Sequence, residues 1–340
     1  MSEQAKPKRV LTGYRPTGKL HLGHWFGNLM SMLEFQHDDY EPFFFVADWH
    51  ALTSNWQNTQ NIPQFTEDMV MDWLAAGLDP KKTVIYRQSD IPEVAELSLY
   101  MSMVTPMSWL ERVPTYKEQK QNITDKDLSN VGFFLYPNLM SADIAIMRAD
   151  AIPVGKDQEA HLEINREIVR RFNGTYGEGI LVEPHAVYAK DGQKVPGIDG
   201  RKMSKSYGNS IYLSDTIEDM KKKAMQFMTD PARKLKTDPG EPNICPLHQV
   251  HKLVAQNPED IAKWEECCRA GSCGCVAHKK AFAEDIAAYF EPFHERRQEI
   301  EKDSDYVRDV LIDGAKRAKP IAEKVISDCR EAMHLNYTGK

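Results

Sequence analysis

The chain has 340 residues, of which 41% are hydrophobic and 27% are charged, and its formal net charge is −7. These proportions are ordinary for a folded globular protein, and the length predicts two domains. No apolar run is long enough to span a membrane and residues 1–9 lack the apolar core of a signal peptide, so we expect a cytoplasmic protein. The negative charge excludes a globally basic surface for nucleic acid but not local basic patches.

The first predicted elements are a short buried strand over residues 10–12, a turn over residues 13–18 and a helix whose apolar pattern begins near Trp25. A strand, a glycine-rich turn and a helix together present backbone N–H groups and a positive helix end to a phosphate. Two histidines, His21 and His24, lie in this region. The opening of the chain therefore predicts phosphate chemistry.

A P-loop is one interpretation of this opening. Residues 13–19 fit the G-x-x-x-x-G-K frame, but Leu20 stands where the Ser or Thr that binds Mg²⁺ is required. Pro16 also removes one backbone amide that such a loop would use. A P-loop NTPase is therefore the weakest of the phosphate-binding interpretations.

The apolar patterns alternate between strands and helices in the first part of the chain, and the strand signal fades after Ser206. They predict, in chain order, a strand at 43–47, a helix at 63–77, a strand at 84–86, a helical insertion at about 92–135, a helix at 136–148, a strand at 152–155, a helix at 157–172, and long helices at 277–293 and 307–333. We expect a Rossmann-like catalytic domain over residues 1–207 and an all-helical domain over residues 208–340.

The predicted strands also indicate where a ligand binds. Alternating strands and helices predict an α/β fold with a parallel sheet, and such sheets bind ligands at the carboxyl ends of their strands. The turn at 13–18, Asp48–His50 and Gln88–Asp90 all follow predicted strands. We expect these segments to lie together around a ligand.

Asp143 interrupts the apolar stripe of its helix, between Leu139 and Met147. Burying a carboxylate is costly unless something donates a hydrogen bond to it. The residue is either a structural aspartate that caps a neighbouring loop or an acceptor for the N–H of a ligand inside an apolar pocket. Both interpretations stay open at this point.

A second motif, Lys202-Met203-Ser204-Lys205-Ser206, lies in a polar segment that contains several glycines. Alone it is a solvated, lysine-rich loop. Together the two motifs resemble the "HIGH" and "KMSKS" signatures of class I aminoacyl-tRNA synthetases, with His21-Leu-Gly-His24 as the first. Lysines on a mobile loop suit the charge that develops on pyrophosphate, and imidazole N–H groups at a helix start suit a phosphoryl group.

The helix that contains Asp143 indicates which class I synthetases the chain resembles most. Tyr136-Pro-x-Leu-Met-x-Ala-Asp143 is similar to the amino-acid-binding helix of tryptophanyl-tRNA synthetases, whose aspartate accepts the indole N–H. Further similar stretches are Asp48-x-His50, Pro153-Val-Gly155-x-Asp157-Gln158, Thr229-Asp-Pro-x-Arg233 and Asp238-Pro-Gly-x-Pro242. On these motifs the chain is identified as a member of the bacterial-type tryptophanyl-tRNA synthetase family.

The resemblance implies a reaction and its partners. L-tryptophan is activated with ATP and Mg²⁺ to tryptophanyl-adenylate and pyrophosphate, and tryptophan is then transferred to tRNA(Trp), which the helical domain would recognise. A homodimer is also implied. The implied catalytic residues are His21, His24, Lys202 and Lys205, and the implied tryptophan-binding residues are Asp143, Met140, Gln158 and His50. ATP is expected against Arg15, Pro16, Thr17, Gly23, His24, Gly155, Lys156, Asp157, Val195, Lys202, Met203, Ser204, Lys205 and Ser206.

Two alternatives share much of this pattern. A tyrosyl-tRNA synthetase has the same signatures, but a phenol pocket calls for a Tyr and Asp pair, whereas Met140 with Asp143 suits indole. A non-catalytic RNA-binding paralogue would not need His21, His24 and both lysines of the second motif. Arg15 departs from the family pattern, because other members can carry Gln there, so its ATP role is the less firm one.

Five of the six cysteines lie within 31 residues: Cys245, Cys267, Cys268, Cys273 and Cys275. A disulfide framework is not expected in a cytosolic chain of this length, so the cluster predicts a metal centre. Some tryptophanyl-tRNA synthetases carry a [4Fe–4S] cluster on the pattern C-x22-C-x6-C-x2-C. Cys245, Cys268 and Cys275 match three of these positions, and His278 occupies the fourth, with Cys273 as an alternative ligand. The open interpretations are an iron–sulfur cluster, zinc, or free cysteines of a decayed site.

Overall fold

The computed structural model describes residues 8–37, 40–113, 128–155, 159–188, 195–235, 237–303 and 305–336. Its centre is a sheet whose strands pair in the order β3-β2-β1-β4-β5, every pair being parallel. The strands are β1 (Lys8–Tyr14), β2 (Tyr40–Val46), β3 (Val84–Arg87), β4 (Ala151–Val154) and β5 (His185–Tyr188). The predicted α/β fold with a parallel sheet is confirmed.

Both faces of the sheet are covered, because successive side chains of a central strand enter different hydrophobic clusters. On β2, Phe44 and Val46 pack into one cluster, and Phe43 and Phe45 pack into the other. A strand that is buried on both faces needs a continuous apolar run. The run at 43–47 therefore identified β2 in the sequence.

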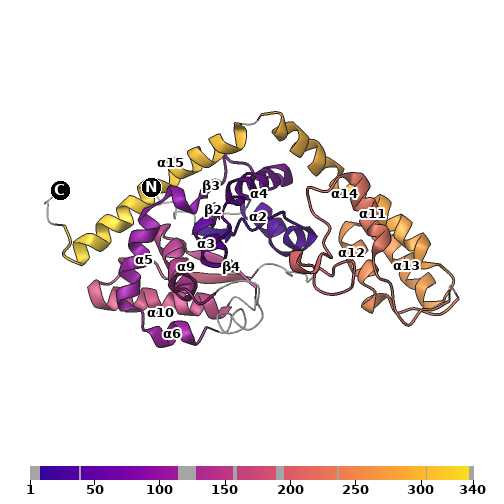
Figure 1. Cartoon of the computed structure of the whole chain (residues 1–340), viewed down its shortest axis with the longest axis horizontal. Coiled ribbons are helices and arrows are strands. Elements are labelled where there is room, and N and C mark those ends of the chain that lie inside the picture. Colours follow the sequence, from indigo (N-terminus) through magenta and orange to yellow (C-terminus); the bar gives the residue numbers. More distant parts are fainter. Residues whose placement is uncertain are drawn as a thin grey trace, which may run out of the picture.

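Helices connect the strands in the first half of the chain and lie on either side of the sheet (Figure 1). One short stretch, η1, is a π-helix, a rare conformation that is frequent at functional sites. The helices are α1 (Leu22–His24), η1 (Trp25–Leu29), α2 (Met30–Phe35), α3 (Asp48–Asn55), α4 (Ile62–Ala76), η2 (Gln88–Asp90), α5 (Glu93–Val104), α6 (Met107–Glu111), α8 (Val131–Phe134), α9 (Tyr136–Ile146) and α10 (Glu159–Tyr176).

The second half of the described chain is helical after β5. The sequence does not predict β5, because His185–Tyr188 has only four residues and none of them is buried. Part of the predicted insertion, residues 114–127, lies outside the described residues. The later helices are η3 (Lys205–Tyr207), α11 (Ile217–Gln226), η4 (Pro242–Ile244), α12 (Pro246–Val254), α13 (Pro258–Arg269), α14 (Cys275–Glu301) and α15 (Tyr306–Ala332).

The two longest helices reach different parts of the molecule. Figure 1 shows α11, α12 and α13 at one end beside α14, whereas α15 passes back alongside the sheet. A Cβ atom on Gly314 of α15 would lie 1.8 Å from the carbonyl oxygen of Ile85 in β3, so glycine permits this close approach. The division of the chain into domains at residue 207 stays a prediction.

A buried ion pair joins α14 to α4. Nε of Arg297 in α14 donates to Oδ1 of Asp72 in α4 at 2.9 Å, and Asp72 is 1% exposed. Such a pair stabilises the packing only while both partners are present. Within the described ranges, we find no helix with the length and apolarity that crossing a membrane requires.

Candidate active site

The predicted site residues gather at the carboxyl ends of the parallel strands. The loop over residues 15–21 follows β1, α3 begins at Asp48 after β2, η2 begins at Gln88 after β3, and Gly155 follows β4. The strand order reverses between β1 and β4. Open parallel sheets bind ligands at such a reversal point, so the turn after β1 is in the position that a ligand would occupy.

His21 and His24 form a capping box at the start of α1. Nδ1 of His21 accepts a hydrogen bond from the N–H of Gly23, and Nδ1 of His24 accepts one from the N–H of His21, each at 3.1 Å. A Cβ atom on Gly23 would lie 2.8 Å from the His21 ring, so any side chain here would displace that ring. The tetrapeptide is therefore one geometric unit rather than two independent histidines.

Both imidazoles are neutral near pH 7. Burial, helped by the charges of Lys205 and Lys202, lowers the pKa of His21 to about 4. Burial, helped by His21 and the same lysines, lowers the pKa of His24 to about 2. Because each Nδ1 accepts a hydrogen bond, the single ring proton of each is on Nε2. The pair thus offers two neutral N–H donors to an anionic group.

The second motif is anchored beside these histidines. Met203 is buried in the core, and its N–H donates to the carbonyl oxygen of Val195 at 3.0 Å. The N–H of Leu22 donates to the carbonyl oxygen of Ile211 at 3.1 Å, next to an antiparallel bridge between His21 and Tyr212. Backbone hydrogen bonds therefore hold the first motif against the segment that follows the second motif.

Lys205 reaches from η3 to the turn after β1. Its Nζ donates to the carbonyl oxygen of Gly18 at 2.9 Å, although the two residues are 187 positions apart. Burial, together with the charge of Arg15, lowers the pKa of Lys205 to about 8. Lys202 of the same motif is exposed. The ammonium group of Lys205 is therefore partly shielded from solvent, whereas that of Lys202 is solvated.

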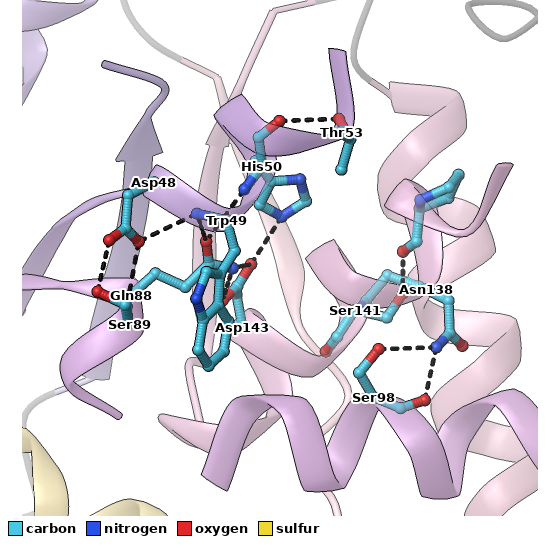
Figure 2. A network of polar contacts seen from close by, with 12 residues as sticks. Asp48, Trp49, His50, Thr53, Gln88, Ser89, Ser98, Asn138, Ser141 and Asp143 are labelled. Atoms are coloured by element: carbon cyan, nitrogen blue, oxygen red, sulfur yellow. Dashed lines mark hydrogen bonds and ion pairs between the residues drawn. The ribbon is translucent and has the colours of Figure 1, made fainter. Parts of the chain in front are cut away.

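Asp143 of α9 is 2% exposed and is hydrogen-bonded by side chains from two other segments (Figure 2). Nε2 of His50 lies 2.9 Å from Oδ2, and Nε2 of Gln88 donates to Oδ1 at 2.8 Å and to Oδ2 at 2.9 Å. Burial raises the pKa of Asp143, and the hydrogen bonds from His50 and Gln88 oppose this shift. The partners of this carboxylate are side chains at a strand end and a helix start, not a loop backbone that it caps.

Gln88 lies in a segment that the sequence places near a ligand, but the sequence does not predict its contact with Asp143. Its side-chain Oε1 accepts hydrogen bonds from the N–H of Trp49 at 3.1 Å and of His50 at 3.3 Å, and its exposure is 0%. The available signal was its place directly after a predicted strand. A glutamine in that place does not reveal its partner, since Asp143 is 55 residues away.

The other predicted site residues differ in exposure. Met140 is half-buried on α9, one turn before Asp143. Three predicted residues, Lys156, Asp157 and Gln158, lie outside the described part of the chain. Of the predicted ATP-binding residues, the buried ones are Pro16, Val195 and Met203, the half-buried ones are Thr17, Gly23, His24, Ser204 and Lys205, and the exposed ones are Arg15, Gly155, Lys202 and Ser206.

The predicted metal ligands converge on one small cavity. Cys245, Cys268, Cys275 and His278 all line it, together with Arg233. His278, however, already has partners: its Nε2 lies 2.9 Å from Nδ1 of the buried His251, and its ring stacks on Trp264.

The arrangement does not fit a metal centre. Nη1 of Arg233 lies 3.8 Å from Sγ of Cys268 and 3.7 Å from Sγ of Cys275, so a cation occupies the space beside the sulfur atoms. Cys273 is joined to Cys267 by a disulfide, which corrects its expected roles as a free thiol and as an alternative ligand. Among the described residues, no group of three or more His, Cys, Asp or Glu side chains is placed to hold a metal ion. The predicted iron–sulfur or zinc site is therefore not supported.

Comparisons with known proteins agree with this geometry. The family of class I tRNA synthetases for W and Y matches residues 3–291. The tryptophan–tRNA ligase of Thermotoga maritima is 44% identical over 330 residues, which cover 97% of this chain and 100% of that protein. The ligase of Aquifex aeolicus is 39% identical, covering 96% of this chain and 100% of that protein.

The fold is also similar to that of a solved synthetase. The tryptophanyl-tRNA synthetase of Campylobacter jejuni, complexed with ADP and tryptophan, matches with a TM-score of 0.85 at 33% identity. The match covers 96% of this chain and 99% of that one. This chain therefore belongs to the tryptophan–tRNA ligases, within the class I tRNA synthetases for tryptophan and tyrosine.

Proposed function

We propose that the site at the carboxyl ends of β1 to β4 activates L-tryptophan with ATP. The carboxylate of tryptophan attacks the α-phosphate of ATP, which forms tryptophanyl-adenylate and releases pyrophosphate. Tryptophan then passes from the adenylate to the 3′ end of tRNA(Trp). Family membership supports this reaction, and the site residues below supply the chemistry that it needs.

The phosphate end of the site consists of the two signature motifs. Little covalent work falls to the protein in this reaction, so positioning and charge stabilisation carry it. The Nε2–H groups of His21 and His24 donate hydrogen bonds to the phosphates, as their neutral state and Nδ1 contacts allow. Lys205 and Lys202 neutralise the charge that develops on pyrophosphate. Mg²⁺ would arrive with ATP and would supply further charge neutralisation at the phosphates.

The tryptophan end of the site lies at Asp143 of α9. A buried carboxylate that is already held by His50 and Gln88 is an acceptor, and the indole ring carries a single N–H donor. The ring itself is apolar and suits the half-buried Met140 on the same helix. The engaged, buried carboxylate of Asp143 is the observation that favours tryptophan over an amino acid without a ring N–H.

ATP–pyrophosphate exchange with each of the twenty amino acids tests this proposal. We expect exchange with tryptophan and background rates with tyrosine and phenylalanine, because the phenylalanine ring has no donor for Asp143 and the tyrosine hydroxyl stands at a different place on its ring than the indole N–H. The matched control is the same preparation of the Lys205→Ala variant, which identifies any contaminating activity. Exchange that is equal or faster with tyrosine would overturn the assignment.

A homodimer is the assembly that we propose for this chain. On α5, Leu99 and Met103 are four residues apart on one face and are 54% and 66% exposed, and Met107 of α6 is 67% exposed. An apolar surface of this kind is typical of a contact between subunits. Light scattering should give a dimer mass, and Met103→Glu should shift it toward the monomer, whereas Glu259→Lys, a charge change on the exposed surface of α13, should not.

Recognition of tRNA(Trp) by the segment over residues 208–340 and a cytoplasmic location complete the proposal. Both follow from the family, and neither depends on a metal. The cysteine pocket has no step in this mechanism, since its arginine and disulfide leave no ligand set for iron or zinc among the described residues.

A further inference from the structure

We infer that Gln88 is a positioning residue that sets the specificity for tryptophan, by orienting Asp143 so that one carboxylate lone pair is left for the indole N–H. This inference rests on the proposed binding of tryptophan at Asp143. It concerns a residue that does not itself have to touch the substrate.

The orientation of the Gln88 amide is determined by its neighbours. Its Oε1 faces two backbone donors, the N–H groups of Trp49 and His50 at the start of α3 (Figure 2). The amide nitrogen must then point the other way, toward Asp143. A glutamine fits both sides of this contact because it carries an acceptor and two donors. A glutamate in the same place would fit the α3 side only.

Counting hydrogen bonds locates the remaining acceptor of Asp143. A carboxylate has about four lone-pair positions, two on each oxygen. Oδ2 accepts from His50 and from Gln88, and Oδ1 accepts from Gln88 alone. The amide N–H of Gln88 is shared between the two oxygens, and Oδ2 also holds the bond from His50, so Oδ1 is the oxygen that keeps a free lone-pair position. A ligand N–H that reaches Asp143 would complete the set.

Burial makes this arrangement selective. Gln88 is 0% exposed and Asp143 is 2% exposed, so water does not readily replace a missing donor. A ligand without an N–H would leave the Oδ1 position unpaired. If Gln88 were absent, the carboxylate could rotate or take up a proton, and the difference between a ligand with the N–H and one without it would shrink.

A merely structural role for Gln88 is the alternative, because the same side chain ties β3, α3 and α9 together. The two roles predict different outcomes. A structural tie would, when broken, lower activity toward every ligand by the same factor. A specificity role would, when removed, change the ratio between tryptophan and an analogue that lacks the ring N–H.

The experiment compares tryptophan with its isostere in which sulfur replaces the ring N–H, 3-benzothienylalanine, in ATP–pyrophosphate exchange. We expect the native chain to prefer tryptophan in kcat/KM by about 100-fold or more. In Gln88→Met and in Gln88→Glu that ratio should fall about tenfold or more, through KM for tryptophan, with KM for ATP nearly unchanged. Gln88→Glu keeps the oxygen that accepts from the N–H groups at the start of α3. It therefore still tests the inference if Gln88→Met disturbs the start of that helix.

Gln88→Glu adds a second readout. Two carboxyl groups at hydrogen-bond distance share a proton, whose loss on raising the pH leaves two charges in contact. The repulsion moves the Asp143 carboxylate away from the indole N–H, so KM for tryptophan in this variant should rise with pH, whereas KM of the native chain should change little.

The matched control is Ser89→Ala. Ser89 belongs to the same turn and donates from Oγ to Oδ2 of Asp48 at 2.5 Å, without contacting Asp143. In Ser89→Ala, the ratio of kcat/KM for tryptophan to kcat/KM for the sulfur analogue should stay at the native value. An unchanged ratio in both Gln88 variants would overturn the inference. Should the native chain not discriminate, or not require tryptophan, the proposed function itself would fail, which is a distinct result.

Discussion

The lowered pKa of Lys205 predicts a specific dependence of the reaction on pH. Nζ of Lys205 contacts the Gly18 carbonyl oxygen, and burial together with Arg15 lowers its pKa to about 8. Only the protonated amine carries the charge that neutralises phosphate. The contribution of Lys205 is therefore present below pH 8 and is lost as the pH rises through that value.

The size of the effect follows from this pKa. At pH 9 about a tenth of the amine stays protonated in the free enzyme, so kcat/KM for ATP should fall about tenfold. Complete removal in Lys205→Ala costs a charge-assisted hydrogen bond of about 1.5–3 kcal/mol. That loss corresponds to about a 10- to 150-fold lower kcat/KM. Bound ATP is anionic and raises the pKa of the lysine, so kcat should depend less on pH than kcat/KM does.

The assay is ATP–pyrophosphate exchange at saturating tryptophan, measured from pH 6.5 to 9.5 in the native chain and in two variants. Lys205→Arg keeps its charge over the whole range, so its profile should lose the decline near pH 8. Lys202→Ala retains Lys205 and should keep the decline, which makes it the matched control. A native decline that persists unchanged in Lys205→Arg would refute the reasoning, because the titrating group would then be another one.

Three further predictions concern other parts of the chain. Asp143→Asn and Asp143→Ala should raise KM for tryptophan by the equivalent of about 1–3 kcal/mol, and exchange kinetics showing an unchanged KM in both would mean that Asp143 is structural. Arg297→Met should lower the free energy of unfolding by about 3–5 kcal/mol, since it leaves the Asp72 carboxylate buried and unpaired. Urea unfolding measures this, and Arg297→Met together with Asp72→Leu should recover much of the loss. Metal analysis and a visible spectrum after anaerobic purification should show neither iron nor zinc, and one metal centre per chain would contradict the interpretation of the Arg233 pocket.

Local patterns in the sequence determined much of this protein. The apolar run at 43–47 predicts β2 because burial on both faces leaves no polar position in a strand. His21, Gly23 and His24 make their capping contacts within four residues, so the motif alone implies its geometry. Asp143 could be identified as unusual because a carboxylate conflicts with the apolar stripe around it.

Only the tertiary structure decided which distant groups meet. The contact of Lys205 with Gly18 and that of Gln88 with Asp143 depend on the strand order and on the anchoring of the second motif, which no local period encodes. The same holds for the cysteines. Their spacing is compatible with a metal centre, but the position of Arg233 and the pairing of Cys267 with Cys273 depend on how the chain folds around them. Contacts between distant residues are specified by packing across the whole sheet, and for that reason the sequence could indicate the participants of the site but not their partners.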